Sequence, residues 1–214
     1  MLTEELSPVW DDVMNVANEI LEEGAPDLLA SISGIEKALQ RKSTYQRMNE
    51  KRMQRIASNI EFIPFSSAFR DAFRNLNEDW LNTYLGITEH DRKTLTDPMS
   101  EIIDKNGSIT LMMYDGQAIG SYALKMKGNH SCELSKFTIH KNFRGMGLGK
   151  RLMNKAIQEA RSAACDTMLL FTHHKLVEAT QLYRKMGFEE NKEQHDMVDE
   201  TGRCSMMMKL HINQ

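Results

Sequence analysis

Glycine occupies every second position from 145 to 149 in the segment Phe143-Arg144-Gly145-Met146-Gly147-Leu148-Gly149-Lys150-Arg151. This segment follows an apolar run at residues 132–139 that is typical of a strand. Glycine lacks a Cβ atom, so its backbone can approach a ligand closely and turn successive N–H groups toward one anion. Apolar residues then recur at helical spacing, at Leu148, Leu152, Met153, Ala156, Ile157 and Ala160. The pattern predicts a helix that ends near residue 164, with a pyrophosphate group bound at its N-terminus.

Two common phosphate-binding motifs do not fit this loop. A nucleotide P-loop requires glycine where the chain has Arg144, and Ser or Thr where it has Arg151. A dinucleotide-binding G-x-G-x-x-G motif that starts at Gly145 requires glycine at the position of Lys150. The loop is therefore expected to bind the pyrophosphate of another class of ligand.

Two motifs at matching spacing carry a family resemblance. Arg144-x-x-Gly147-x-Gly149 resembles the Q/R-x-x-G-x-G/A signature of the GNAT superfamily of acyl-CoA-dependent N-acyltransferases. Ala179-Thr180-Gln181-Leu182-Tyr183-Arg184-Lys185-Met186-Gly187-Phe188 resembles the A-x-x-L-Y-x-K-x-G-F ending of the same family. Residues 76–81, with Asp91, Leu95, Asp97 and Pro98, resemble a GNAT branch also found fused behind MarR-type regulators. The likeness covers residues 59–214, and residues 1–58 lie outside it.

The expected fold class is α/β, with a mixed, mainly antiparallel central sheet flanked by helices, as in the GNAT fold. Strands are expected at residues 60–65, 108–114, 117–127, 132–139, 167–172, 188–191 and 205–210, and Asp115-Gly116 predicts a tight hairpin. Helices are expected at residues 66–76, from an N-cap at Asn77, and from Asp97-Pro98 to about residue 104. The resemblance implies that strands 132–139 and 167–172 are parallel neighbours, splayed at one end to admit the pantetheine arm.

Composition indicates an ordinary globular protein. The chain has 214 residues, 41% hydrophobic and 27% charged, with a formal net charge of −3. No apolar run reaches the length of a membrane span, and residues 1–30 contain eight carboxylates and no Lys or Arg, unlike a secretory signal. These features favour a cytoplasmic protein with no membrane partner and make nucleic acid an unexpected partner. Three unclustered cysteines, Cys132, Cys165 and Cys204, predict neither a disulfide set nor a metal site.

The first 58 residues predict a helical N-terminal extension, and residues 59–214 predict the acetyltransferase domain. Six basic residues and one acidic residue, Glu50, occupy positions 41–55 and follow the acidic first segment. One interpretation is a solvated helix pair with facing opposite charges. The other is a dimerisation or docking arm, and a homodimer corresponds to the dimerisation case alone.

The resemblance implies acetyl-CoA as co-substrate and no metal. It assigns the pantetheine arm to the backbone of Phe137 and Ile139. It assigns the pyrophosphate to Arg144, Gly145, Met146, Gly147, Leu148, Gly149 and Lys150. The Ile139 N–H is also the expected oxyanion donor. Where the family commonly carries Asn, this chain has His173, which is expected to donate a hydrogen bond to the pantetheine amide or to Tyr183.

Two residues are candidates for catalysis. Tyr183 matches the family tyrosine that protonates the departing CoA sulfur, because a phenol keeps its proton at neutral pH; the alternative is a packing role. Glu133, near the start of its strand, is the candidate base for the acceptor ammonium. The alternative for Glu133 is an ion pair with a nearby cation or a role in orienting the substrate.

These features predict an N-acetyltransferase that moves an acetyl group from acetyl-CoA to a primary amine by direct attack in a ternary complex. The acceptor would be a small molecule or a protein amine. A non-enzymatic acyl-CoA-binding sensor or regulator is the alternative, since His173 departs from the family pattern. A nucleic-acid-associated regulator that uses residues 41–55 is a further alternative.

Overall fold

The computed structural model describes residues 7–24, 27–191 and 206–212. The chain divides into two compact units, Met1–Arg55 and Ile56–Gln214. The sequence places the boundary after residue 58, and the independence of the two parts as domains stays a prediction. None of the helices in the described part of the chain is long and apolar enough to cross a bilayer.

The first unit is helical. It contains α1 (Ser7–Gly24), α2 (Leu28–Arg41) and most of α3 (Thr44–Ser58). At the start of α3, the Ser43 N–H donates to Gln46 Oε1 (2.8 Å), and the Gln46 N–H donates back to Ser43 Oγ (3.2 Å). The Arg47 guanidinium donates to the carbonyl of Ala38 (2.8 Å). These bonds satisfy backbone groups at the junction of α2 and α3.

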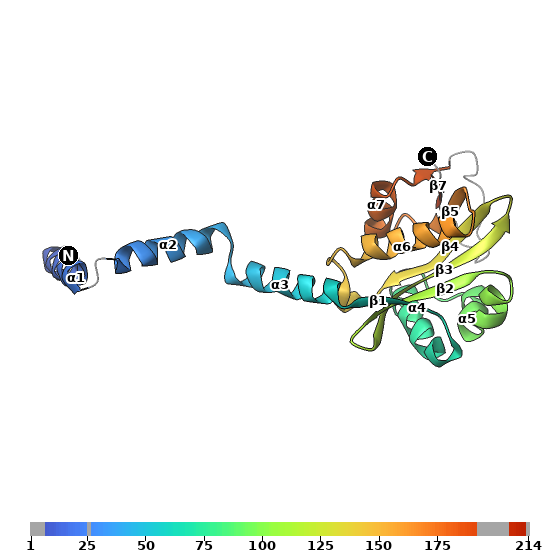
Figure 1. Cartoon of the computed structure of the whole chain (residues 1–214), viewed down its shortest axis with the longest axis horizontal. Coiled ribbons are helices and arrows are strands. Elements are labelled where there is room, and N and C mark those ends of the chain that lie inside the picture. The colour runs from blue at the N-terminus through green and yellow to red at the C-terminus, as the bar shows by residue number, and fades with distance from the viewer. Residues whose placement is uncertain (1–6, 25–26, 192–205, 213–214) are drawn as a thin grey trace. The chain divides into compact units, whose positions relative to one another are not determined.

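The second unit is built on one seven-stranded sheet in the order β1-β2-β3-β4-β5-β7-β6 (Figure 1). The strands are β1 (Ile60–Pro64), β2 (Ser108–Tyr114), β3 (Gln117–Gly128), β4 (Ser131–Ile139), β5 (Thr167–Thr172), β6 (Glu189–Glu190) and β7 (Met206–His211). Only the β4–β5 pair is parallel among these seven strands. The predicted mixed, mainly antiparallel α/β fold is confirmed.

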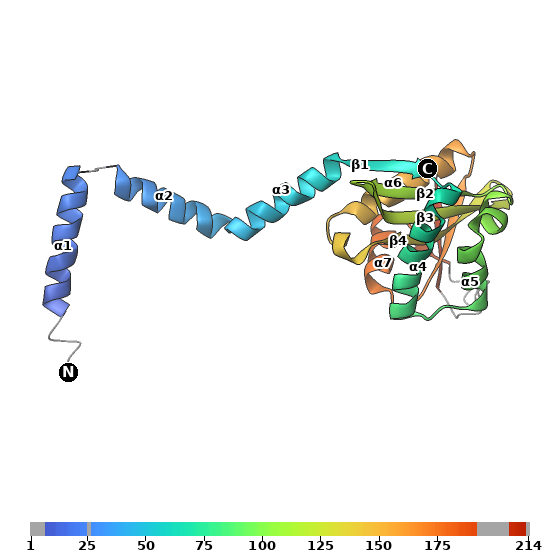
Figure 2. The same cartoon turned by 90° about the horizontal axis from the view of Figure 1, so that it is seen from below.

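Helices cover both faces of the sheet (Figures 1 and 2). One face packs against α4 (Arg70–Tyr84), α5 (Glu89–Thr96) and the π-helical turn η2 (Met99–Ile103), through an apolar cluster centred on Phe73, Leu95 and Ile102. The other face packs against α6 (Leu148–Ser162) and α7 (Val177–Lys185), through a cluster that includes Leu152 and Met168. Two short 3₁₀ turns, η1 (Ser67–Phe69) and η3 (Lys141–Phe143), precede α4 and the glycine loop.

The helix boundaries near residue 77 differ from the sequence prediction. One continuous helix, α4, runs from Arg70 to Tyr84, so the prediction that Asn77 caps a new helix is wrong. Asn77 is fully buried, and its side-chain amide donates to the Phe73 carbonyl (2.9 Å) and to Ser121 Oγ (3.3 Å). A buried amide needs such partners, and the sheet supplies one of them. Tertiary contact therefore overrides the local preference of Asn for helix ends.

Local turn chemistry gives one confirmed feature and one that the sequence analysis missed. Asp115 and Gly116 both have positive φ, 49° and 73°, as the tight hairpin between β2 and β3 requires. Thr88 and Asp91 form a capping box at the start of α5, in which each side chain accepts from the backbone N–H of the other. The helix expected from Asp97-Pro98 is the turn η2, with Pro98 at its N-cap.

Candidate active site

The parallel pair β4–β5 separates at one end. Cα partners run from Ser131 and Thr167 to Leu134 and Leu170, and the pairing stops there although both strands continue. The expected splay between these strands is thus present. It opens a gap in the middle of the sheet on the side of the glycine loop.

A bulge in β4 accompanies this separation. On β3, Ser121 is the partner of Thr138 and Ala123 is the partner of Ser135, so Lys136 and Phe137 together stand opposite one residue. Lys136 has a φ of 51°, an unusual backbone conformation for a residue other than glycine. The extra residue bends β4 and redirects the residues that follow it.

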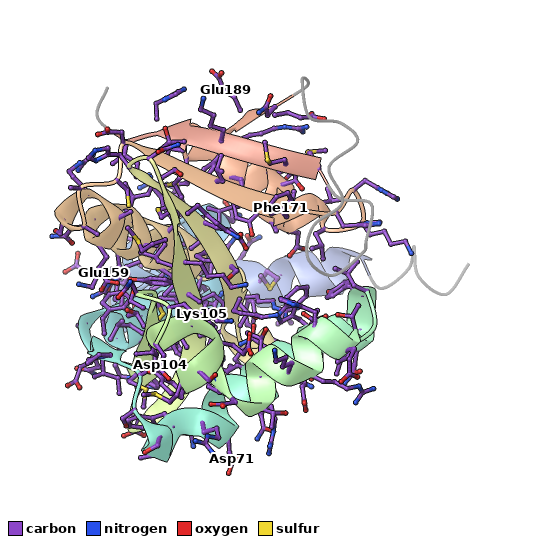
Figure 3. All side chains as sticks on the ribbon, turned by 90° about the vertical axis from the view of Figure 1, so that its right-hand side faces the viewer. Asp71, Asp104, Lys105, Glu159, Phe171 and Glu189 are labelled. Atoms are coloured by element: carbon purple, nitrogen blue, oxygen red, sulfur yellow. The ribbon has the colours of Figure 1, made fainter. Side chains whose placement is uncertain are left out.

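The gap is the mouth of a cleft of about 490 Å³. Its walls come from the second half of β4, the end of β5, one side of α7 and the turn before it, the loop at residues 143–149, and Trp80 and Tyr84 of α4. Figure 3 marks Phe171, one of the lining residues, on β5. Five of the residues predicted to bind the co-substrate line the cleft: Phe137, Ile139, Arg144, Gly145 and Gly149.

The glycine loop has the backbone that an anion cradle needs. Gly145 and Gly147 each have a φ of 74°, and no atom lies within 4 Å of the position that a Cβ would take at either residue. Gly147 is also the N-cap of α6, so the free N–H groups of the first helical turn begin at this loop. The space over the loop is open, and the residues present fit a pyrophosphate group.

Three other predicted residues of the loop contribute differently. Met146 and Leu148 pack on the hydrophobic core, and neither is among the residues that line the cleft. Lys150 also lies outside the lining set. The backbone of this segment is thus free to face a ligand while two of its side chains anchor the loop.

Arg144 connects the loop to the end of β4. Its Nε–H donates to the Ile139 carbonyl (3.0 Å), and its guanidinium lies 3.5 Å from the Tyr84 hydroxyl. The guanidinium therefore places a fixed positive charge at the wall of the cleft beside the cradle.

Tyr183 lies in the wall of the cleft on α7 and is also part of the core. Its ring makes an edge contact with Phe137 (centroids 6.1 Å apart) and a tilted contact with Phe188 (5.9 Å). Burial raises the pKa of Tyr183 above its ordinary value, because the charged phenolate would be poorly solvated there. The hydroxyl therefore keeps its proton and can act as a hydrogen-bond donor. The packing role and the donor role are compatible at this position.

Glu133 does not face the cleft. Its carboxylate forms an ion pair with Lys127 of β3 at 2.8 Å, and it is not among the lining residues. This arrangement matches the alternative interpretation, in which Glu133 pairs with a nearby cation.

His173 precedes α7 and also lies outside the lining set. Its Nδ1 accepts from the Lys175 backbone N–H (3.1 Å), and its ring stacks near that of His174 (centroids 4.0 Å apart). The contact stabilises the turn into α7. Across residues 7–24, 27–191 and 206–212, no cluster of three or more His, Cys, Asp or Glu side chains is arranged to hold a metal ion.

The groups that hold the bulge were not predicted from the sequence. The Ser121 hydroxyl donates to the Lys136 carbonyl (3.2 Å), and Asn77 of α4 supports Ser121 from behind. The Lys136 ammonium reaches Asp91 of α5 at 2.7 Å. The spacing of Thr88 and Asp91 could have predicted the capping box, but no local signal shows that β3, α4 and α5 meet at Lys136.

Two hydroxyl oxygens at the cleft are buried without a hydrogen-bond partner among the described residues. They are Ser135 Oγ on β4 and Thr172 Oγ1 on β5, on the two strands that separate. Buried polar groups are normally bonded, so these two point to a ligand with polar groups of its own.

Comparison with known proteins decides the family. Residues 68–188, more than half of the chain, match the Acetyltransferase (GNAT) family. The chain belongs to this family. It is an acyltransferase enzyme. The likeness of this GNAT chain to the branch fused with MarR-type regulators stays a prediction.

Individual relatives of this GNAT enzyme are similar to it in sequence or in fold. The uncharacterized N-acetyltransferase YvbK of Bacillus subtilis is 24% identical over 58% of this chain and 88% of its own length. An acetyltransferase of the GNAT family from Staphylococcus aureus Mu50 has a TM-score of 0.64 at 19% identity, over 72% of this chain and 99% of its own. The PaiA N-acetyltransferase of Thermoplasma acidophilum, in complex with coenzyme A, has a TM-score of 0.57 at 18% identity, over 71% and 98%.

Proposed function

We propose that this GNAT enzyme transfers an acetyl group from acetyl-CoA to a primary amine by direct attack in a ternary complex. The observation that carries the proposal is the splay of β4 from β5 beside the glycine loop, with Tyr183 in the wall. One cleft thus joins an anion cradle, an unpaired strand edge and a protonated phenol. The acceptor is a small molecule or a protein amine.

The main chain binds the donor. The Phe137 and Ile139 backbone lies where β4 has lost its β5 neighbour, so a pantetheine arm with two amide groups can pair there as an added strand. The N–H groups between Arg144 and Lys150 take the pyrophosphate. The Thermoplasma protein of similar fold, which is in complex with coenzyme A, supports this assignment.

The reaction forms one N–C bond and breaks one C–S bond. The neutral amine attacks the thioester carbonyl, the Ile139 N–H stabilises the oxyanion, and the sulfur departs with the C–S electron pair. The Tyr183 hydroxyl donates to this sulfur, and the phenol then regains a proton from solvent. Because burial raises the pKa of Tyr183, complete transfer to a thiolate is uphill, so we expect a contribution near about 10²-fold, the lower end for a general acid.

The amine proton is lost to water in the cleft. Glu133 is paired with Lys127 and does not line the cleft. We therefore propose that its role is structural, in this ion pair, and that it does not act as the catalytic base. Glu133→Gln is then expected to leave the pH dependence of the rate unchanged. If Glu133→Gln instead lowers the rate by about 10² or more and changes the acidic limb of the pH–rate profile, Glu133 is the base.

A panel of primary amines, read out by the release of free CoA thiol, tests the proposed function. The wild-type enzyme should release CoA with at least one amine and form a stoichiometric amide, and Tyr183→Phe should be slower with that amine. Tight acetyl-CoA binding without CoA release for any amine would contradict transfer and favour the sensor.

A further inference from the structure

Helix α2 carries a row of exposed apolar side chains. The residues Leu28, Ile32, Ile35 and Leu39 follow one another at spacings of four, three and four, and they are exposed by 41%, 43%, 60% and 47%. This spacing is the seam of a coiled coil, in which a second helix covers the row. Continuous exposed apolar patches on a protein surface are usually contact sites.

The helices on either side carry similar rows. On α1, Val13, Val16 and Ile20 are exposed by 50%, 53% and 64%. On α3, Tyr45 and Met48 are exposed by 76% and 67%. All three helices of the first unit therefore present an apolar face.

The charges around these rows select the partner. Residues 7–24 contain five carboxylates and no Lys or Arg, whereas residues 44–55 contain four basic residues and only Glu50 as an acid. An acidic segment at one end of the arm and a basic segment at the other are complementary when two identical arms run antiparallel. In a parallel pair the same segments would repel their own copies.

We propose that residues 7–55 form an antiparallel dimerisation arm. Two copies of the chain pair about a two-fold axis beside Ile32 and Ile35, so that α1 of one copy lies along α3 of the other. The contact is isologous, since the same face serves both copies. The apolar rows supply the buried surface, and the acidic and basic segments fix the direction.

Sedimentation velocity of the full-length chain over a range of concentrations tests the contact. The wild type should show a monomer–dimer equilibrium. Ile35→Glu places a charge in the seam and should raise the dimer dissociation constant at least about tenfold. The matched control is Gln40→Glu, which adds the same charge on another side of α2 and should change the constant less than about twofold. Circular dichroism of each variant checks that helix content is retained.

The direction of the arms is tested by charge. Lys51→Gln/Arg52→Gln should weaken an antiparallel dimer, because it removes attraction to the acidic α1 of the partner. Added salt should weaken the wild-type dimer for the same reason. A chain that stays monomeric at every concentration, or a dimer unaffected by Ile35→Glu, overturns the proposal. A dimer that tightens after the neutralisation or in salt overturns the antiparallel arrangement.

Discussion

The Lys136 ammonium lies 2.7 Å from the Asp91 carboxylate, and both side chains are almost fully buried. The pair joins the bulge of β4 to the first turn of α5. Lys136 holds a backbone conformation of positive φ, which persists only where the surroundings impose it. Asp91 holds the side chain of Lys136, and Ser121 holds its carbonyl. The shape of the cleft therefore depends on residues outside its wall.

Asp91→Asn is expected to destabilise the fold strongly. The change keeps the shape of the side chain but removes the charge that faces Lys136, and breaking a buried ion pair costs about 3–5 kcal/mol. The matched control is Asp79→Asn, whose pair with Lys141 is longer (3.4 Å) and exposed; it should cost less than about 1 kcal/mol. Urea unfolding of both variants gives the two values. Equal losses of unfolding free energy would mean that the buried ion pair stabilises the fold no more than the exposed one.

The same carboxylate predicts a pH dependence of stability. Burial alone would raise the pKa of Asp91, but the Lys136 ammonium and the hydrogen bonds from Thr88 overcome it and lower the pKa to about 2. A depressed pKa gives stability that is present above the ordinary pKa of 3.8 and is lost as the pH falls through about 2. The difference in unfolding free energy between wild type and Asp91→Asn should shrink over this window. A difference that stays constant there contradicts the assignment.

Tyr183→Phe tests the proton donor. The ring contacts with Phe137 and Phe188 remain, so acetyl-CoA affinity should hold while kcat falls by about 10²-fold. The control is Tyr114→Phe, which also removes a hydroxyl from a packed ring but lies outside the cleft lining; it should leave kcat within about threefold. If Tyr183→Phe also stays within that range, the sulfur takes its proton from solvent.

Gly147→Val tests the anion cradle. A β-branched side chain at a φ of 74° is strained, and it would occupy the open space over the loop. Acetyl-CoA binding should weaken at least about tenfold, as measured by isothermal titration calorimetry. Gly116→Val is the control, because Gly116 has a φ of 73° and equally open surroundings but lies in the β2–β3 hairpin, whereas Gly147 is the N-cap of α6. Both variants should lose stability, and only Gly147→Val should lose affinity for acetyl-CoA. Equal acetyl-CoA affinities of the two variants would contradict the assignment of the loop as the pyrophosphate site.

Two truncations separate the arm from the folded core. A chain that starts at Ile56 should fold and bind acetyl-CoA, because Ile56 is 2% exposed within the core of the second unit. A chain that starts at Asn59 should also bind, but it should be less stable by about 2–4 kcal/mol, the cost of losing a large buried side chain. It also loses the Ala57 carbonyl that accepts from Arg151. Thermal unfolding compares the two, and equal midpoints would show that Ile56 adds nothing to the core.

Local patterns predicted the fold because each one depends on few residues. The positive φ values at Gly145 and Gly147 and the helix that follows them are properties of the loop sequence itself. The hairpin at Asp115-Gly116 is likewise a local choice. Local patterns failed at Asn77, because its side-chain amide donates to Ser121, which is 44 residues away in the sequence.

The candidate site was predictable where backbone geometry dominates and not where distant side chains meet. The family resemblance placed Phe137 and Ile139 on the splayed strand and Arg144 in the glycine motif, and all three line the cleft. Lys125 is opposite Glu133 on β3, and Glu133 makes its ion pair diagonally with Lys127, so a shift of one residue in the register would change the partner. The bulge at Lys136 produces such a shift, and the sequence carries no sign of it.

The separation of β4 from β5 gives this sheet an edge in its interior. Edges at the periphery of a sheet attract other strands and promote aggregation. Here the free edge lies between two strands of the same sheet, beyond the last paired residues Leu134 and Leu170. Because the pairing groups belong to the main chain, substitutions of Phe137 or Ile139 would reshape the cleft and still leave the edge in place. The main-chain edge and the side chains around it can therefore change separately on one strand.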